Sequence, residues 1–112
     1  MKEEEKKILS ILERILLKPV PKHEFKERMI PKEFRKILRW KEFREDYRTS
    51  KIHFYVRVED LIKIGEKIDP MFDREKLFRL LWRFSDLNIV WVPKTDEISC
   101  KGTISGRLKE IF

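Results

Sequence analysis

The chain has 112 residues, a mass of 13.8 kDa and a net charge of +7, from 27 Lys and Arg against 20 Asp and Glu. An apolar share of 41%, with eight Phe and three Trp, excludes a disordered tail, and a single cysteine, Cys100, excludes an intrachain disulfide and a cysteine-based zinc site. The apolar runs are too short for a membrane span and the acid-rich start is unlike a signal peptide, so we expect one cytoplasmic domain over residues 1–112.

The positive charge is concentrated in one third of the chain. Residues 22–57 contain 12 basic and 6 acidic groups and so carry +6 of the net charge, whereas residues 1–21 and 58–112 are nearly neutral. This asymmetry favours a surface that faces a polyanion. The alternative is a solvated, charge-rich surface of a thermophile-like protein, because Lys and Glu are abundant while the chain has one Asn and no Gln.

The first element is an amphipathic helix predicted over residues 3–17. Its apolar residues fall on one face at helical spacing and its first turn is acidic, which suits the positive end of the helix dipole. Prolines at 19 and 21 end it, and residues 22–30 remain ambiguous, with one or two helical turns. We expect this N-terminal extension, residues 1–30, to pack on the domain or to pair with a second copy of the chain. The apolar face comprises Ile8, Ile11, Leu12, Ile15 and Leu16.

A second helix is predicted over residues 31–48, with Pro31 at its first position. Its apolar stripe changes face midway: Phe34, Ile37 and Leu38 share one face, and Trp40, Phe43 and Tyr47 share another. The helix therefore either breaks near residue 40 or packs against two different neighbours.

Strict alternation then predicts a half-buried strand over residues 51–58, with Ile52, Phe54, Val56 and Val58 on one side and His53, Tyr55 and Arg57 on the other. A short helix follows from residue 59 to about 68, and Asp-Pro at 69–70 ends it in a turn.

The last third predicts one more helix and two strands. Asp73 is a suitable N-cap for a helix over residues 74–87. Strands follow at 89–92 and 98–104, joined by a turn at 93–97, and residues 106–112 are compatible with a last helical turn or two.

From residue 31 to 104, the order of elements resembles that of winged helix-turn-helix domains. The resemblance rests on VRVEDLIKIGEKI for the second helix, DPMF for the turn, DREKLFRLLWRF for the third helix and NIVWVPKTDEISCKGTI for the wing hairpin. It implies an α+β, mainly helical fold: a winged helix with an extra N-terminal helix and a small antiparallel β-sheet.

In that family the third helix enters the DNA major groove and the wing contacts the flanking backbone. The resemblance therefore implies DNA contacts from Lys76, Arg79 and Arg83, with Lys101 on the hairpin. Glu75 lies on the same arc, and the arc has no Asn, Gln, Ser or Thr, so we expect limited base readout.

The strongest basic stretch lies outside that helix, so we expect phosphate contacts from it to matter as much. These contacts come from Arg35, Lys36, Arg39, Lys41, Arg44 and Arg48. The favoured function is a small DNA-binding transcription regulator or chromatin-type factor, with DNA preferred over RNA as the ligand. A homodimer, formed through the N-terminal helix, is compatible with this function.

A protein-interaction module or a subunit of a larger complex is the alternative, because winged-helix domains also serve as assembly pieces. Aromatic residues dominate the energetics of such contacts, and the candidates here are Trp40, Phe43, Tyr47 and Trp82, with Tyr55 in the same aromatic set.

Catalytic patterns are missing from the sequence. His23, His53 and Cys100 are too widely spaced to predict a metal site, and no glycine-rich phosphate loop is present. We therefore expect neither an enzyme nor a cofactor nor a bound metal.

Overall fold

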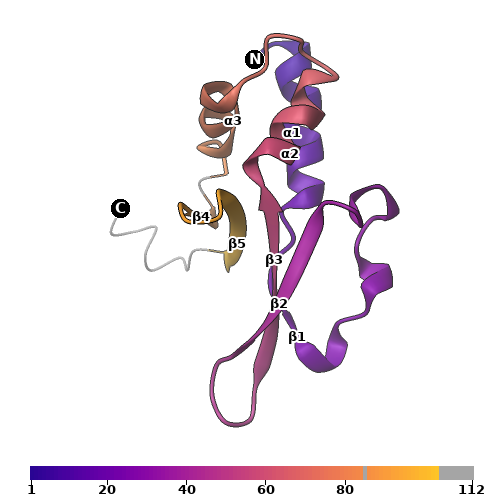
Figure 1. Cartoon of the computed structure of the whole chain (residues 1–112), viewed down its shortest axis with the longest axis vertical. Helices are drawn as coiled ribbons and strands as arrows, with labels where there is room; N and C mark the ends of the chain where they lie inside the picture. The colour runs from indigo at the N-terminus through magenta and orange to yellow at the C-terminus, as the bar shows by residue number, and fades with distance from the viewer. Residues whose placement is uncertain (85, 104–112) are drawn as a thin grey trace.

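A computed structural model describes residues 1–84 and 86–103, and these form three α-helices, three short 3₁₀ turns and one five-stranded antiparallel sheet. Figure 1 shows the helices gathered at one end, while the β2–β3 hairpin projects away from them. The elements in chain order are α1 (Glu3–Ile15), β1 (Val20–Pro21), η1 (Lys22–Glu24), η2 (Glu27–Met29), η3 (Lys32–Phe34), β2 (Leu38–Arg44), β3 (Ser50–Arg57), α2 (Val58–Glu66), α3 (Arg74–Leu81), β4 (Leu87–Val92) and β5 (Glu97–Thr103).

Strand β3 is the centre of the sheet. Strand β2 pairs along the whole of one edge, from Leu38 opposite Val56 to Arg44 opposite Ser50. The other edge of β3 is shared, because β1 pairs near Ile52 and β5 pairs farther along. Strand β4 then pairs with β5 on the outside. The long β2–β3 hairpin extends beyond the helical layer, and the short β1 lies beside β3 in this projecting part (Figure 1).

The helix predicted over residues 31–48 is wrong. A 3₁₀ turn is followed by β2, in which Leu38 is buried and Trp40 is half-buried, while Arg39 and Lys41 are exposed. That alternation has the period of a strand. As a helix, this segment needed its apolar stripe to change face midway, which was a sign that its period is that of a strand. Pairing with β3 decided between helix and strand.

A turn at Asp46 closes the hairpin and was missed by the sequence reading. The carboxylate oxygen Oδ1 accepts hydrogen bonds from the backbone N–H groups of Arg48, at 2.6 Å, and Thr49, at 2.9 Å. These bonds hold the pKa of the Asp46 carboxyl below its ordinary value. A short acidic side chain that binds the backbone two and three residues ahead is a standard way to reverse a chain.

The fold is accordingly α+β but not mainly helical, which corrects the predicted fold class. The first helix that the winged-helix resemblance placed at residue 31 is replaced by a strand, and the sheet has five strands. The later elements occur in the predicted order: a strand, two helices and a hairpin.

The N-terminal helix is confirmed as α1, and its apolar face packs inside the chain. Ile8, Leu12 and Ile15 are almost completely buried, in the same core cluster as Phe54 of β3 and Leu61 of α2. The apolar face of α1 is thus already covered by the rest of the chain, and a homodimer stays a prediction.

The predicted strand at 51–58 and the helix after it are confirmed as β3 and α2. The buried side of β3 is the predicted one, since Ile52, Phe54 and Val56 all lie in the core. In α2, Gly65 faces the ring of Phe72, where a Cβ atom would come within 2.1 Å of ring carbon Cδ2. The close approach of these two residues fixes the corner between α2 and α3.

The next helix begins as predicted but ends early. The Asp73 carboxylate accepts a hydrogen bond from the Lys76 backbone N–H at 2.9 Å, as expected of an N-cap. Helix α3 ends at Leu81, six residues before the predicted end, and Leu87 already belongs to β4. The hairpin of β4 and β5 matches the predicted strands, and the predicted turn at 106–112 lies outside the described residues.

Among the residues described, no helix combines the length and the apolar character needed to cross a membrane.

Candidate nucleic-acid interface

Strand alternation gathers basic and aromatic side chains on the sheet face opposite the core. The register sets Arg39 opposite Tyr55, Lys41 opposite His53 and Phe43 opposite Lys51, so each pair lies on one face. Strand β5 adds a lysine beside them. We call this surface the basic sheet face; it consists of Arg39, Lys41, Phe43, Lys51, His53, Tyr55, Arg57 and Lys101.

Two lysines converge on one tyrosine at the centre of this face. The Nζ atom of Lys41 lies 5.9 Å from the centre of the Tyr55 ring, and Nζ of Lys101 lies 5.2 Å from the same point. Lys101 also donates a hydrogen bond to the Tyr55 hydroxyl at 3.2 Å and lies 5.1 Å from the centre of the Phe43 ring. The aromatic rings thus position two ammonium groups above the sheet.

Carboxylates neutralise the ends of the face but not its centre. At one end the Arg39 Nε donates to buried Glu97 at 3.1 Å, and at the other Lys51 pairs with Glu45 at 3.3 Å. Among the residues described, neither Lys41 nor Lys101 has a carboxylate within ion-pair distance. Because like charges repel, an anion bound between these lysines would be stabilised.

The titration of His53 reflects the same surroundings. Partial burial lowers the pKa of its imidazole below the ordinary value, and the nearby Lys101 ammonium lowers it further, as does Lys51 to a smaller extent. Its Nδ1 atom is buried and, within the described residues, has no hydrogen-bond partner; the same holds for Oγ of Ser99, which lies directly opposite Tyr55. The centre of the face therefore combines positive charge with two unsatisfied polar atoms.

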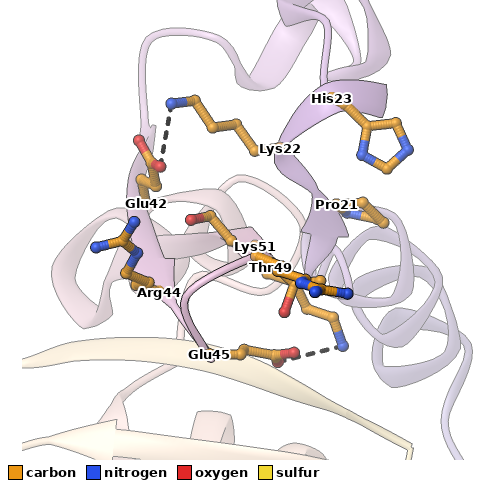
Figure 2. A pocket seen from close by; sticks show the side chains of 10 residues that line it. Pro21, Lys22, His23, Glu42, Arg44, Glu45, Thr49 and Lys51 are labelled. Carbon is orange, nitrogen blue, oxygen red and sulfur yellow. Dashed lines mark ion pairs between the residues drawn. The ribbon is translucent and has the colours of Figure 1, made fainter.

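A second basic region lies toward the tip of the hairpin, in an open hollow of about 940 Å³ that shares Lys51 with the basic sheet face (Figure 2). Two ion pairs cross it: Lys22 to Glu42 at 3.1 Å and Lys51 to Glu45 at 3.3 Å. The Lys22 ammonium holds the pKa of the Glu42 carboxyl below its ordinary value. The hollow is lined by Pro21, Lys22, His23, Glu42, Arg44, Glu45, Arg48, Thr49, Ser50 and Lys51.

The six residues expected to contact phosphate do not form a single surface. Arg39 and Lys41 lie on the basic sheet face, whereas Arg44 and Arg48 line the hollow. Arg35 and Lys36 are exposed in the turn before β2, and Nε of Arg35 donates to the Ile30 carbonyl at 3.4 Å.

The arc of α3 that the family resemblance assigned to DNA is largely self-neutralised. Lys76 pairs with Asp69 at 3.5 Å and Arg79 with Glu75 at 3.2 Å. Only Arg83 of the three predicted residues has no such partner among the residues described. An acidic residue at the tip of the β4–β5 hairpin, Asp96, is also paired with a cation.

At that tip, Asp96 accepts two hydrogen bonds from Arg74, at 2.7 and 2.8 Å, and one from the Trp91 indole at 2.8 Å. The Arg74 guanidinium and the indole together lower the pKa of the Asp96 carboxyl to about 2. This network ties the start of α3 to the hairpin.

The aromatic residues proposed for a partner protein are also dispersed. Trp40 is half-buried against Phe25, Phe43 lies on the basic sheet face, and Tyr47 is exposed in the hairpin loop. Trp82 is 83% exposed at the end of α3. It borders an apolar groove of about 420 Å³, lined by Phe78, Leu81, Trp82, Phe84, Leu87, Ile89, Trp91 and Ile98.

The last candidates from the sequence analysis are the thiol of Cys100 and a metal site. Cys100 is buried, and burial raises the pKa of its thiol, so it behaves as a small core residue. No group of three or more metal-ligating side chains occurs in the part of the chain that the structure describes.

Sequence reasoning left Lys51 and His53 out of the candidate sites and considered Tyr55 only for a partner surface. The signal was present, because the alternation of β3 already put His53 and Tyr55 on its outer side. Reading residues 38–44 with the same period would have placed Lys41 and Phe43 beside them.

No protein-family model matches this chain, and no curated protein or solved structure is detectably similar to it.

Proposed function

We propose that this protein binds nucleic acid, chiefly through phosphate contacts to the basic sheet face, and performs no catalysis. The observation that supports this most directly is the pair of ammonium groups over Tyr55, because neither Lys41 nor Lys101 is neutralised by a carboxylate in the described residues. A phosphodiester between them relieves their repulsion and releases condensed counterions from the nucleic acid.

The other groups on the face extend this contact. Arg39 and Arg57 lie on the same face, toward β5, and each keeps about half of its side chain exposed while paired with a glutamate. Lys51 stands toward the hairpin tip and the hollow with Arg44 and Arg48. A strand crossing the centre thus meets further cations at both ends, which suits a polymeric anion better than a small one.

The role in the cell that fits is a small nucleic-acid-binding factor, such as a regulator of transcription or a chromatin-type protein, in the cytoplasm. Base-edge recognition is limited, because the whole chain has one Asn and no Gln.

The test is fluorescence anisotropy with labelled oligonucleotides over a range of salt concentrations. The variant Lys41→Ala/Lys101→Ala should bind about tenfold more weakly at low salt. The slope of its log affinity against log salt concentration should become less steep by about 1.4 to 1.8, because each phosphate contact contributes about 0.7 to 0.9 to that slope.

A matched control removes two exposed lysines elsewhere. Lys63→Ala/Lys67→Ala, at the end of α2, loses the same charge and should keep the wild-type salt dependence. Equal losses of affinity in both variants would mean that net charge alone accounts for the binding. Absence of binding by the wild type at low salt would refute the proposed function.

A second candidate function, protein interaction, is favoured by one observation: an exposed indole stands beside an apolar groove. Trp82 is both the most exposed large apolar side chain described and a lining residue of the groove. A two-fold contact is self-complementary, so Trp82 of one copy can enter the groove of another. The occupant we propose is therefore a second copy of the chain.

This candidate is tested by the molar mass in solution over a concentration series. The Trp82→Ser variant should remain monomeric where the wild type dimerises, and Met29→Ser, an exposed apolar residue outside the groove, should behave as wild type. A monomeric wild type at high concentration would dismiss self-association.

A further inference from the structure

Phe43 is the exposed aromatic residue of the basic sheet face. Its side chain is 42% exposed, on the outer edge strand β2. His53 packs edge-on against its ring with centroids 5.0 Å apart, and Tyr55 lies 6.5 Å away. The neighbouring rings hold Phe43 in place on the sheet. The Phe43 side chain would therefore lose little conformational entropy when an aromatic ligand stacks on it.

Two cations lie close to this ring, and one of them, Lys101, stands over one of its faces. Lys101 Nζ lies 5.1 Å from the centre of the Phe43 ring, and Lys41 is two residues away along the same face of β2. A base on the ring would therefore leave its phosphate near both ammonium groups. Stacking on aromatic rings within a positively charged groove is how proteins hold single strands without reading their sequence.

A duplex does not use such a ring. In a double helix the faces of the bases are covered by their neighbours, and only the edges are accessible in the grooves. Amide side chains that read those edges are also scarce, since the chain has one Asn and no Gln. Flat aromatic surface together with unpaired ammonium groups favours unstacked bases.

We propose that the ligand of the basic sheet face is single-stranded nucleic acid, with a base stacked on Phe43 and its phosphate between Lys41 and Lys101. This inference rests on the proposed function and narrows its ligand. Recognition of the strand is tolerant of sequence, because every base has a face that can stack.

The experiment compares a labelled single-stranded oligothymidine, the equivalent oligouridine and a DNA hairpin duplex of equal phosphate number, at one salt concentration. We expect either single strand to bind at least tenfold more tightly than the duplex. Phe43→Ala should weaken single-strand binding between about 5- and 150-fold, the effect of losing one stacked base, and leave duplex binding within about twofold.

Two further variants separate stacking from folding. Phe43→Tyr keeps the ring and should retain single-strand affinity, whereas Met71→Ala, an exposed apolar residue on the turn before α3, should change nothing. Circular dichroism checks that each variant is folded.

The outcomes distinguish the two proposals. A duplex bound as tightly as the single strands, with no effect of Phe43→Ala, would overturn the single-strand inference and leave nucleic-acid binding intact. Failure of the wild type to bind any of the three probes at low salt would remove both.

Discussion

The basic sheet face and the exposed arc of α3 both cluster cations, but among the residues described only the sheet face brings together two cations, Lys41 and Lys101, that have no carboxylate partner. On α3, Glu75 lies four residues before Arg79, and the two pair on the helix surface. On the sheet, the residues beside Lys41 and Lys101 are aromatic. Counting basic residues does not separate the two regions, whereas the position of the carboxylates does.

Reversing the two lysine charges of the basic sheet face should have the largest effect on nucleic-acid affinity. Lys41→Glu/Lys101→Glu puts two carboxylates at the centre of the face, and we expect nucleic-acid affinity to fall at least about 100-fold at low salt, through lost contacts and repulsion. Arg79→Glu on α3 should cost less than about threefold, because that charge is already matched. Anisotropy titrations of both variants make the comparison; a larger loss for Arg79→Glu would move the site to α3.

Removing the carboxylate at the end of the basic sheet face should have the opposite effect and increase nucleic-acid affinity. Glu97→Gln frees Arg39 from its buried partner, and we expect affinity to rise about threefold. The same change should lower stability by about 1–2 kcal/mol, since the partner arginine is half-exposed and a fully buried pair would cost more. Urea unfolding measures the second effect, and an unchanged affinity would mean that Arg39 does not meet the ligand.

The Asp96 network separates folding from binding. Because its folded pKa of about 2 lies below the ordinary value of 3.8, the carboxylate adds stability above pH 3.8 that is lost as the pH falls toward 2. Asp96→Ala should reduce stability at neutral pH by at most about 1 kcal/mol, a small effect because the pair is exposed. The variant should be less sensitive than the wild type to acid in this range, with nucleic-acid affinity unchanged.

The smallest effect concerns His53. Its lowered pKa means that the free protein holds it neutral near pH 7, and a bound phosphate favours the protonated form. We expect affinity to rise two- to threefold between pH 7.5 and 5.5, which corresponds to uptake of about 0.2 of a proton, since one fully coupled proton would give about tenfold per pH unit. His53→Gln should remove that slope. The sign for folding is opposite: without ligand, stability falls as the pH drops below 6.5.

Local patterns were enough to predict α1 and most of the elements from β3 onward. The buried face of α1, the alternation of β3 and the cap at Asp73 were all predicted, because each depends on residues a few positions apart. The apolar period of a helix or a strand follows directly from backbone geometry.

Residues 31–48 were mispredicted for a different reason. Their apolar spacing is compatible with two periods over a short window, and the contest was decided by β3, whose edge supplies hydrogen bonds to the whole of β2. The Asp46 turn could have indicated a hairpin, since it contributes a local side-chain cap.

By itself, the sequence determined the positive charge of residues 22–57, the apolar faces that build the core, and the absence of a disulfide framework. Tertiary structure alone decided which cations meet: it put a lysine of β5 beside one of β2, sixty residues earlier in the chain, over a ring of β3. Side-chain period is a property of the local backbone, but adjacency in a sheet depends on strand pairing between distant segments, and no short stretch of sequence encodes it.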